Sequence, residues 1–363
     1  MNNRKRIVAV NATALANGGG LSILQQFVDH IVDEHQYYIF VPHTLTIRSL
    51  SDAIHIIPVS TNSFVKRVLW DLFGLKRWFA KQDLMVDVVL SLQNTSVSYH
   101  KHIKQWIYVH QGLCLHPAKW SFLKRQERML AMYKYIYPFF IFLHANRHTE
   151  FIVQTQWMKD RLCDQFKRST QQVHVIKPDV LRVDIADVDT IVLPESNILF
   201  YPANHWLFKN HDELFFALHE MRNSHYDMSS IGLYLTMDED PRLVRLLEKL
   251  GLRQNVHFVG TLSYDEVLVY YKSCSAVVFP SYIESFGLPL LEAAMFGKPI
   301  IAADESYARE VLAGYTNVRF VALHSPLLWR DAIVQSLECA SVREGYVPRY
   351  DSSWDDVFQL LHS

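Results

Sequence analysis

Two carboxylates near the end of the chain, Glu284 and Glu292, flank a turn and the start of a predicted helix. The apolar run A-V-V-F at residues 276–279 precedes them and predicts a buried strand. Pro289 suits the first turn of a helix, where its missing N–H costs little, and Gly297 suits the C-terminal cap. We therefore expect Glu284 in the loop at the carboxyl end of a strand, and Glu292 about one turn into the next helix.

Ligands of open α/β sheets bind at that edge of the sheet. The backbone N–H groups at the helix start would face the same crevice, and a helix N-terminus favours a phosphate. The residues concerned are Ser285, Phe286, Gly287 and Leu288. A phosphate cradle with a carboxylate on either side suits a nucleotide-sugar, because the carboxylates accept hydrogen bonds from sugar hydroxyls.

Residues 280–299 (P-S-Y-I-E-S-F-G-L-P-L-L-E-A-A-M-F-G-K-P) closely resemble the E-x7-E signature of retaining glycosyltransferases with the GT-B fold, notably glycosyltransferase family 4. In that family the first glutamate contacts the donor sugar and the second the nucleotide ribose. The resemblance implies these roles for Glu284 and Glu292. Without the surrounding pattern, the two would be an exposed loop residue and a solvated helix residue.

A second segment, Y-P-A-N-H-W-L-F-K-N at residues 201–210, follows another predicted strand, and Lys209 is expected to begin a helix. Many family members carry an arginine five residues before this lysine, and the two cations hold the donor diphosphate. Here Lys209 matches, but Asn204 stands at the arginine position. Asn204 can donate a hydrogen bond without charge, so either His205 or Arg309 compensates, or the phosphates rely on backbone donors.

Two features of the first half of the chain are further candidates. Asn17 and the three glycines after it predict a turn before a helix, where Gly18, Gly19 and Gly20 would let a bulky group approach the backbone. His110 ends the run Y-V-H at residues 108–110 and would face the crevice. A flexible turn and a structural histidine are the plainer interpretations. The resemblance places the glycine-rich loop near the donor phosphates and the histidine near the donor sugar.

Strands and helices alternate along the chain, which predicts parallel sheets covered by helices. The fold class is therefore α/β, and the resemblance implies GT-B, two Rossmann-like domains with parallel sheets facing a central cleft. We expect an acceptor-binding domain at 1–178, a nucleotide-sugar-binding domain at 179–345 and a C-terminal segment at 346–363. A polar, acidic linker is expected at about 177–189, and Trp354 would anchor a final helix on the first domain.

Composition excludes several classes of protein. The chain has 363 residues and a net charge of -1, which argues against a nucleic-acid binder. No apolar run is long enough for a membrane span or a signal peptide. Four scattered cysteines form no metal or redox motif and are expected to be buried thiols of a reducing compartment. His144 and His148 have helical spacing but lack the glutamate of a zinc motif, so we expect no metal.

The aromatic stretch at residues 133–143 follows the cations Lys124, Arg125 and Arg128, a combination that suits a membrane interface as well as a core helix. Family members that build bacterial surface polysaccharides such as O-antigen often use polyprenyl-linked acceptors. The resemblance to that branch implies a cytoplasmic enzyme, peripheral on the inner membrane.

The expected function is the metal-independent transfer of a hexose-type sugar from a nucleotide-sugar to a saccharide acceptor, with retention of configuration and without a cofactor. Glu284, His110 and Lys209 are the expected catalytic residues. Residues expected to bind the donor are Glu292, Lys209, Asn204, Ser285, Phe286, Gly287, Leu288, Gly19 and Gly20. The alternatives are a GT-B epimerase or phosphorylase, and a non-catalytic GT-B binding subunit. The sequence leaves the sugar, base, acceptor, linkage and oligomeric state open.

Overall fold

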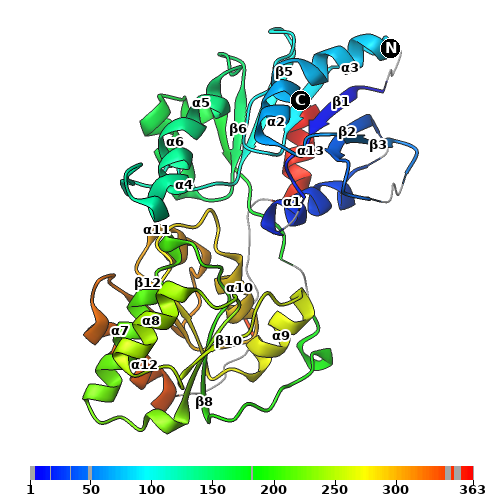
Figure 1. The fold of residues 1–363 in the computed structure, drawn as a ribbon. Coiled ribbons are helices and arrows are strands. Elements are labelled where there is room, and N and C mark those ends of the chain that lie inside the picture. The colour runs from blue at the N-terminus through cyan, green and yellow to red at the C-terminus, as the bar shows by residue number, and fades with distance from the viewer. Residues whose placement is uncertain are drawn as a thin grey trace. The chain divides into compact units, whose positions relative to one another are not determined.

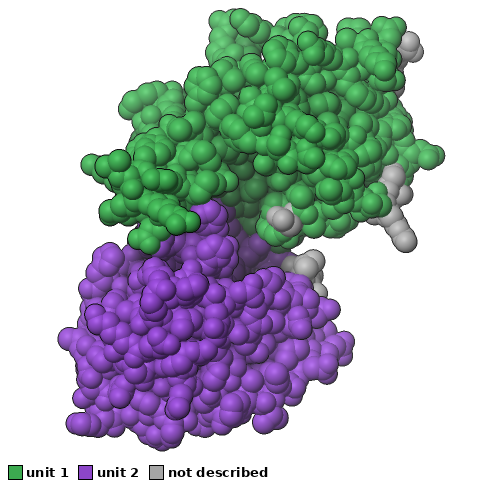
Figure 2. Space-filling model, viewed as in Figure 1, with its two compact units in different colours: residues 1–179, 350–363 green, residues 180–349 purple. Residues whose placement is uncertain are grey.

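The computed structural model describes residues 5–16, 18–32, 34–47, 51–180, 183–339, 345–346 and 353–362. The chain divides into two compact units (Figure 2). Unit 1 comprises residues 1–179 and 350–363, and unit 2 comprises residues 180–349. The division between residues 179 and 180 falls within the polar stretch at 177–189.

In the described residues, unit 1 is built on a parallel sheet of seven strands in the order β3-β2-β1-β4-β5-β6-β7. The strands are β1 (Ile7–Asn11), β2 (Gln36–Pro42), β3 (Ile54–Val59), β4 (Val88–Ser91), β5 (Lys104–Val109), β6 (Glu150–Val153) and β7 (Val173–Val175). The central strands are almost wholly buried, as their continuous apolar runs require of a sheet covered on both faces.

The helices of unit 1 cover this sheet (Figure 1). They are α1 (Gly18–Asp29), α2 (Phe64–Leu69), α3 (Leu75–Gln82), α4 (Arg128–Ala131), α5 (Tyr137–Phe142), α6 (Gln156–Phe166) and α13 (Trp354–His362). Two π-helical segments, η1 (Trp70–Gly74) and η3 (Met132–Ile136), interrupt α2–α3 and α4–α5. Such π-helical turns are frequent at functional sites.

The last helix, α13, lies beside α1 within unit 1 (Figure 1). The Trp354 ring is fully buried, stacks on Tyr108 with 5.5 Å between ring centroids, and meets Phe27 edge-on at 6.0 Å. Its Nε1 donates to Gln26 at 2.9 Å. Residues far apart in the sequence therefore share the core that covers one face of the first sheet.

The described residues of unit 2 form a parallel sheet of six strands in the order β10-β9-β8-β11-β12-β13. The strands are β8 (Asn197–Tyr201), β9 (Ile231–Leu235), β10 (Val256–Phe258), β11 (Ala276–Phe279), β12 (Ile300–Ala303) and β13 (Val318–Val321). The helices are α7 (His211–Asn223), α8 (Pro241–Leu250), α9 (Tyr264–Ser273), α10 (Leu288–Met295), α11 (Ser306–Val311) and α12 (Pro326–Glu338). The α/β class with two parallel sheets is as expected from the sequence.

Each sheet has a point where the strand order reverses. In unit 1 it lies between β1 and β4, and in unit 2 between β8 and β11. Loops that leave the carboxyl ends of these strand pairs run to opposite faces and leave a crevice, which is where open α/β sheets bind ligands.

Several local expectations were wrong. Sequence periodicity missed β3, which contains Pro58, and the short strands β7 and β13. Gly18–Gly20 form the first turn of α1 instead of a turn before it, with only Gly18 at a positive φ of 57°. The helical cost of these glycines is offset by burial of the apolar face of α1, which includes Leu24 and Phe27. Asn17 lies outside the described residues.

Two further expectations concern cysteines and membranes. Cys114 and Cys274 are buried, but Cys163 is half-buried and Cys339 is exposed, so two of the four cysteines are the buried thiols expected. Within the described ranges, no helix has the length and apolar character needed to cross a lipid bilayer. The aromatic stretch at 133–143 is divided between faces: Ile141 is buried in the core, while Tyr135, Ile136 and Phe139 are exposed.

Candidate active site

Lys209 and Glu284 meet at the switch point of the second sheet. Lys209 ends the short 3₁₀ turn Leu207–Lys209 that follows β8, so it precedes α7 and does not begin it. Glu284 lies in the loop between β11 and α10, as the turn signals predicted. The Lys209 Nζ atom is 2.5 Å from Oε1 of Glu284, and both side chains are largely buried, at 12% and 15% exposure.

Aromatic residues and backbone contacts hold this pair in place. Tyr201, at the end of β8, donates its hydroxyl to the Lys209 carbonyl at 2.6 Å. The backbone N–H of Tyr282 donates to the Phe208 carbonyl at 3.1 Å, which joins the loops after β8 and β11. Both loops are therefore fixed relative to one another before any ligand arrives, as a preorganised site requires.

Gly287 starts α10 in the left-handed region, with a φ of +96°. A Cβ atom there would approach the ring of Tyr307 to 3.2 Å, so both the backbone conformation and the space favour glycine. Tyr307 is fixed in turn by a 2.6 Å hydrogen bond from its hydroxyl to the Ser281 carbonyl. This brings the first N–H groups of α10, at Leu288, close to the Glu284 loop.

The side chains of residues 285–288 differ in exposure. Phe286 is 2% exposed and packs in the core, so its side chain is not available to a ligand. Ser285 and Leu288 are half-buried. Of the four residues expected to form the phosphate cradle, Gly287 and Leu288 lie at the helix start itself, where N–H groups lack intrahelical acceptors.

Glu292 lies in α10 one turn beyond its start, as predicted. It accepts a 3.1 Å hydrogen bond from the Tyr271 hydroxyl, which also donates to the Pro289 carbonyl at 3.0 Å. Burial raises the pKa of Glu292 to about 7, although hydrogen bonds from Tyr271 and Tyr264 act in the opposite direction. The carboxyl is therefore held in a polar pocket of α9 and α10 and is separate from the Lys209–Glu284 pair.

His205 and Arg309, the two residues expected to compensate for the missing arginine, lie in different surroundings. Asn204 and His205 are both exposed after β8, and Oδ1 of Asn204 accepts a hydrogen bond from the Trp206 N–H at 3.3 Å. Arg309 is bound by Asp304 through contacts of 2.5 and 2.8 Å, and its guanidinium stacks on Phe320. Arg309 is thus engaged elsewhere, while His205 stays next to Asn204 in the chain.

Two buried polar residues beside Lys209 were missed by the sequence analysis. Asn210 Nδ2 and His211 Nε2 are buried and, among the described residues, have no hydrogen-bond partner. Burial first, and then the neighbouring cation of Lys209, lowers the pKa of His211 to about 3, so the imidazole is neutral. Unsatisfied buried groups are uncommon in native proteins, and these two lie next to a cation in the candidate site.

In unit 1 the structure brings His110 and Gly20 together. His110 follows β5, and a Cβ atom on Gly20 would lie 3.9 Å from its Cε1. Asn94 binds the histidine twice: its Oδ1 accepts from the His110 N–H at 2.7 Å, and its Nδ2 lies 3.1 Å from Nε2. Burial lowers the pKa of His110 to about 4, so Nε2 accepts a hydrogen bond as a neutral imidazole. Gly19 faces open space.

A polar network at the switch point of the first sheet was also missed. Asp71, from η1, accepts hydrogen bonds from Asn11 at 3.0 Å, Gln93 at 3.1 Å and Thr95 at 2.9 Å. Burial raises the pKa of Asp71 to about 6, against these hydrogen bonds. The polar run Q-N-T-S after the apolar β4 was the available signal, since it follows the carboxyl end of a buried strand.

His144 and His148 lie in turns after α5, outside any helix, so their spacing does not place them on one helical face. Among the described residues there is no group of three or more histidine, cysteine or acidic side chains that could hold a metal ion.

A comparison with protein families agrees with the geometry of unit 2. Residues 190–346 match the family model described as Glycosyl transferases group 1. Unit 2 is therefore a group 1 glycosyltransferase domain. The matched range contains Lys209, Glu284, Gly287 and Glu292, so the candidate residues of unit 2 lie within it.

Curated relatives of this glycosyltransferase domain share part of their length with the chain. The O-antigen chain mannosyltransferase RfbU of Salmonella typhimurium is 24% identical over 235 residues, which cover 63% of this chain and 62% of that protein. The D-inositol 3-phosphate glycosyltransferase of Corynebacterium diphtheriae is 34% identical over 102 residues, 28% of this chain and 24% of the relative. The chain thus spans less than two thirds of the length of either relative.

Solved structures resemble the whole chain. WaaG, a glycosyltransferase involved in lipopolysaccharide biosynthesis, superposes with a TM-score of 0.66 at 15% identity, over 98% of this chain and 99% of that one. HepE of Anabaena, in complex with UDP-glucose, gives a TM-score of 0.61 at 14% identity, over 98% of each chain. At these identities the likeness concerns the fold, and it confirms the expected GT-B architecture.

Proposed function

We propose that the chain transfers a hexose-type sugar from a nucleotide-sugar to a saccharide acceptor, with retention of configuration. The observation that carries the proposal is the buried pair of Lys209 and Glu284, 2.5 Å apart at the switch point of the unit 2 sheet. A cation and a carboxylate side by side there can contact the diphosphate and the sugar of one donor molecule.

The chemistry follows from where charge develops. As the bond between the sugar and the diphosphate breaks, negative charge grows on the diphosphate, and Lys209 with the N–H groups at Gly287 and Leu288 would stabilise it. Glu284 would accept a hydrogen bond from a sugar hydroxyl. In the ligand-free protein Lys209 and Glu284 neutralise each other. Donor binding would replace this one charge-assisted contact by two, from Lys209 to the diphosphate and from a sugar hydroxyl to Glu284. Glu292 would hold the ribose.

The unpartnered polar atoms of Asn210 and His211 support a ligand at this place. Both are buried directly after Lys209, and a bound donor would satisfy them. Among the structural neighbours, HepE was solved with UDP and glucose and with UDP-glucose. A uridine diphosphate sugar is therefore the first donor to test.

Unit 1 would bind the acceptor. Its switch point carries His110, Gly20 and the Asp71 network, all at the carboxyl edge of the first sheet. Asp71 would accept a hydrogen bond from a hydroxyl of the acceptor saccharide. Because the pKa of its carboxyl is about 6, Asp71 can also exchange a proton near neutral pH. His110, neutral and held by Asn94, would donate or accept without changing charge.

We propose further that the acceptor is lipid-linked, on a polyprenyl diphosphate, and that unit 1 lies on the cytoplasmic face of the inner membrane. Exposed apolar side chains gather on two neighbouring segments, which Phe64 and Phe140 join through a ring contact at 5.5 Å. They are Phe64, Val65, Leu69, Phe73, Phe122, Leu123, Met129, Tyr135, Ile136 and Phe139. Lys124, Arg125 and Arg128 add charge that suits an anionic surface. The relative RfbU acts on an O-antigen chain, which is in keeping with such an acceptor.

The proposal is tested by screening nucleotide-sugars for binding by mass spectrometry and then measuring transfer onto lipid-linked saccharides. Glu284→Gln should keep the fold and nucleotide binding but lose most transfer, with kcat falling more than KM rises. Exposed Glu248, on α8, provides the matched control Glu248→Gln. Unchanged turnover in Glu284→Gln would remove the assigned role.

The same screen separates the alternatives. An epimerase would convert the donor to its isomer without any acceptor, and a phosphorylase would release a sugar phosphate when given a glycan and phosphate. A binding subunit would hold the donor tightly and give no product with any acceptor.

A further inference from the structure

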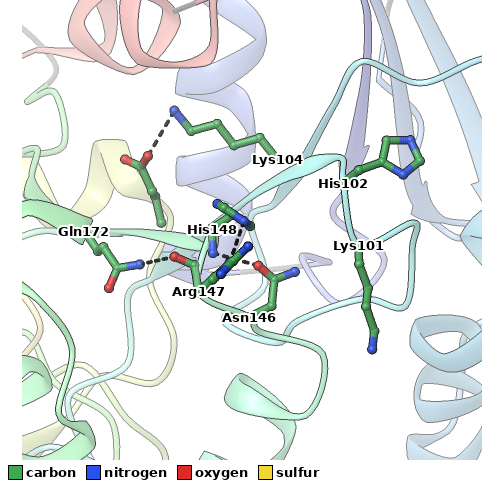
Figure 3. A pocket seen from close by; sticks show the side chains of 8 residues that line it. Lys101, His102, Lys104, Asn146, Arg147, His148 and Gln172 are labelled. Carbon is green, nitrogen blue, oxygen red and sulfur yellow. Dashed lines mark hydrogen bonds and ion pairs between the residues drawn. The ribbon is translucent and has the colours of Figure 1, made fainter.

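A cavity of about 1040 Å³ opens in unit 1 away from the carboxyl edge of the sheet (Figure 3). It lies at the amino ends of β5, β6 and β7, between the loops that lead into these strands. Its lining residues are Lys101, His102, Lys104, Asn146, Arg147, His148, Glu150 and Gln172. None of them belongs to the site proposed for donor or acceptor.

Positive charge dominates this cavity. Three of the lining residues, Lys101, Lys104 and Arg147, carry a cation, and only Glu150 carries an acid. Glu150 is already engaged, because it contacts the Lys104 Nζ atom at 3.0 Å (Figure 3). It also contacts His174 Nε2 at 2.7 Å. Glu150 therefore neutralises the charge of Lys104, and the charges of Lys101 and Arg147 remain uncompensated.

The two remaining cations stay available to a ligand. In the part of the chain that the structure describes, neither Lys101 nor Arg147 has a carboxylate partner. Arg147 donates its Nε to His148 Nε2 at 3.0 Å, so its terminal N–H groups are not needed by that contact. Asn146 is oriented by the His148 N–H, which donates to its Oδ1 at 2.7 Å and leaves the Nδ2 donor for a further acceptor.

We propose that this cavity binds an anion that carries two or more phosphate groups. A guanidinium and an ammonium are the usual partners of phosphate oxygens, and the neutral amide of Asn146 adds a donor without adding charge. The volume is at the upper end of small-molecule sites, about 300–1,000 Å³, which suits more than a single phosphate. Concave walls that carry one sign of charge concentrate counter-ions of the opposite sign.

The same chemistry occurs in a soluble polyphosphate and in the headgroup of a lipid that carries two or more phosphate groups. Both sources present clustered phosphate oxygens to Lys101 and Arg147, and the cavity itself does not distinguish them. The inference does not depend on the proposed transfer reaction, because the lining residues take no part in it.

The test is calorimetric titration of the full chain with inorganic pyrophosphate, in saturating UDP so that the candidate donor site is filled. Wild type should bind one further pyrophosphate, and Lys101→Gln/Arg147→Gln should bind it at least about tenfold more weakly, since charge-assisted hydrogen bonds are lost. The control, Lys81→Gln/Arg161→Gln, removes the same charges from exposed positions elsewhere in unit 1 and should bind like wild type.

Two additions complete the experiment. The single variant Lys101→Gln changes only an exposed side chain, so it should fold, and it should show a smaller loss of the same kind. Vesicles of phosphatidylcholine with phosphatidylinositol bisphosphate identify the source: displacement of pyrophosphate by the vesicles indicates a lipid headgroup, and its retention a soluble ligand. Absence of the additional pyrophosphate, or equal affinities in the double variant and its control, would overturn the proposal.

Discussion

The Tyr271 hydroxyl donates to Glu292 across 3.1 Å, from α9 to α10, and to the Pro289 carbonyl in the same helix. This contact fixes the Glu292 carboxyl, the group that we propose binds the ribose, in a setting that penalises its charge. Burial raises the pKa of Glu292 from 4.5 to about 7. The ionised carboxyl of Glu292 therefore costs stability in the ligand-free protein.

We predict that Glu292→Gln stabilises the ligand-free protein at pH 8 and has little effect at pH 4. The folded pKa lies above the unfolded one, so ionisation costs stability as pH rises from about 4.5, and the full cost is present above about pH 7. The variant removes that cost, which is on the order of 1–3 kcal/mol after allowance for the part-exposed side chain.

Denaturant unfolding at the two pH values measures this difference. Glu248→Gln, on the exposed side of α8, is the control and should change neither value appreciably. An equal effect of Glu292→Gln at pH 4 and pH 8 would contradict the raised pKa as the source of the stabilisation.

Glu292 should also bind the nucleotide whatever sugar it carries. Glu292→Ala is expected to weaken UDP by about 1.5–3 kcal/mol, the usual range for a hydrogen bond to a charged group. Calorimetry at pH 8, where the carboxyl is ionised, measures the loss with free UDP. Equal affinities in wild type and variant would exclude the ribose assignment, and a loss for UDP without a loss for 2′,3′-dideoxy-UDP would support it.

A third prediction concerns the position where family members often carry an arginine. Asn204 is exposed after β8 and makes only a 3.3 Å contact with the Trp206 N–H. Asn204→Arg should raise the affinity for UDP about fivefold, because a charged donor contributes roughly 1 kcal/mol more than a neutral one. Asn204→Gln is the control, since it lengthens the side chain without charge.

The affinities for UDP and for uridine together show whether the side chain at position 204 contacts the diphosphate. A cation that reaches the diphosphate should tighten UDP and leave uridine unchanged. If Asn204→Arg binds UDP no better than Asn204→Gln does, then the residue is not directed at the phosphates, and His205 or the backbone donors of α10 assist Lys209 in that role.

The parts of the fold that the sequence predicted are those with local causes. Glu284, Gly287, Pro289 and Glu292 were placed correctly because a strand, a left-handed glycine and a helix-starting proline occur within one short segment. Long buried strands such as β1 and β5 were predicted for the same reason, since each is a continuous apolar run.

The parts that were missed depend on residues far apart in the chain. Asp71 gives no local signal in its helix, and its role appears only where Asn11 approaches it from β1 and Thr95 from the loop after β4. Gly18–Gly20 looked like a turn because helix propensity disfavours glycine, and tertiary packing of α1 overrode that preference.

The last prediction concerns the aromatic segment of unit 1. Phe139 is 60% exposed, whereas Phe140 packs edge-on against Phe64 at 5.5 Å and accepts backbone contacts from Ser96. We predict that the protein sediments with vesicles of anionic phospholipid and that Phe139→Ser reduces this binding without unfolding the chain. Phe140→Ser should instead lower stability by about 1 kcal/mol, because the half-buried ring loses its contact with Phe64.

High salt distinguishes the electrostatic attraction to the membrane from the burial of aromatic rings in it. Basic residues near an anionic surface contribute about 1 kcal/mol each, and salt screens that contribution, whereas rings buried among headgroups resist it. High salt should therefore release wild type only in part and Phe139→Ser almost completely. Leu328→Ser, which changes an exposed apolar residue on α12 of unit 2, should behave like wild type. If wild type ignores the vesicles, or if Phe139→Ser binds as wild type does, the exposed aromatic face serves another contact and the membrane proposal is wrong.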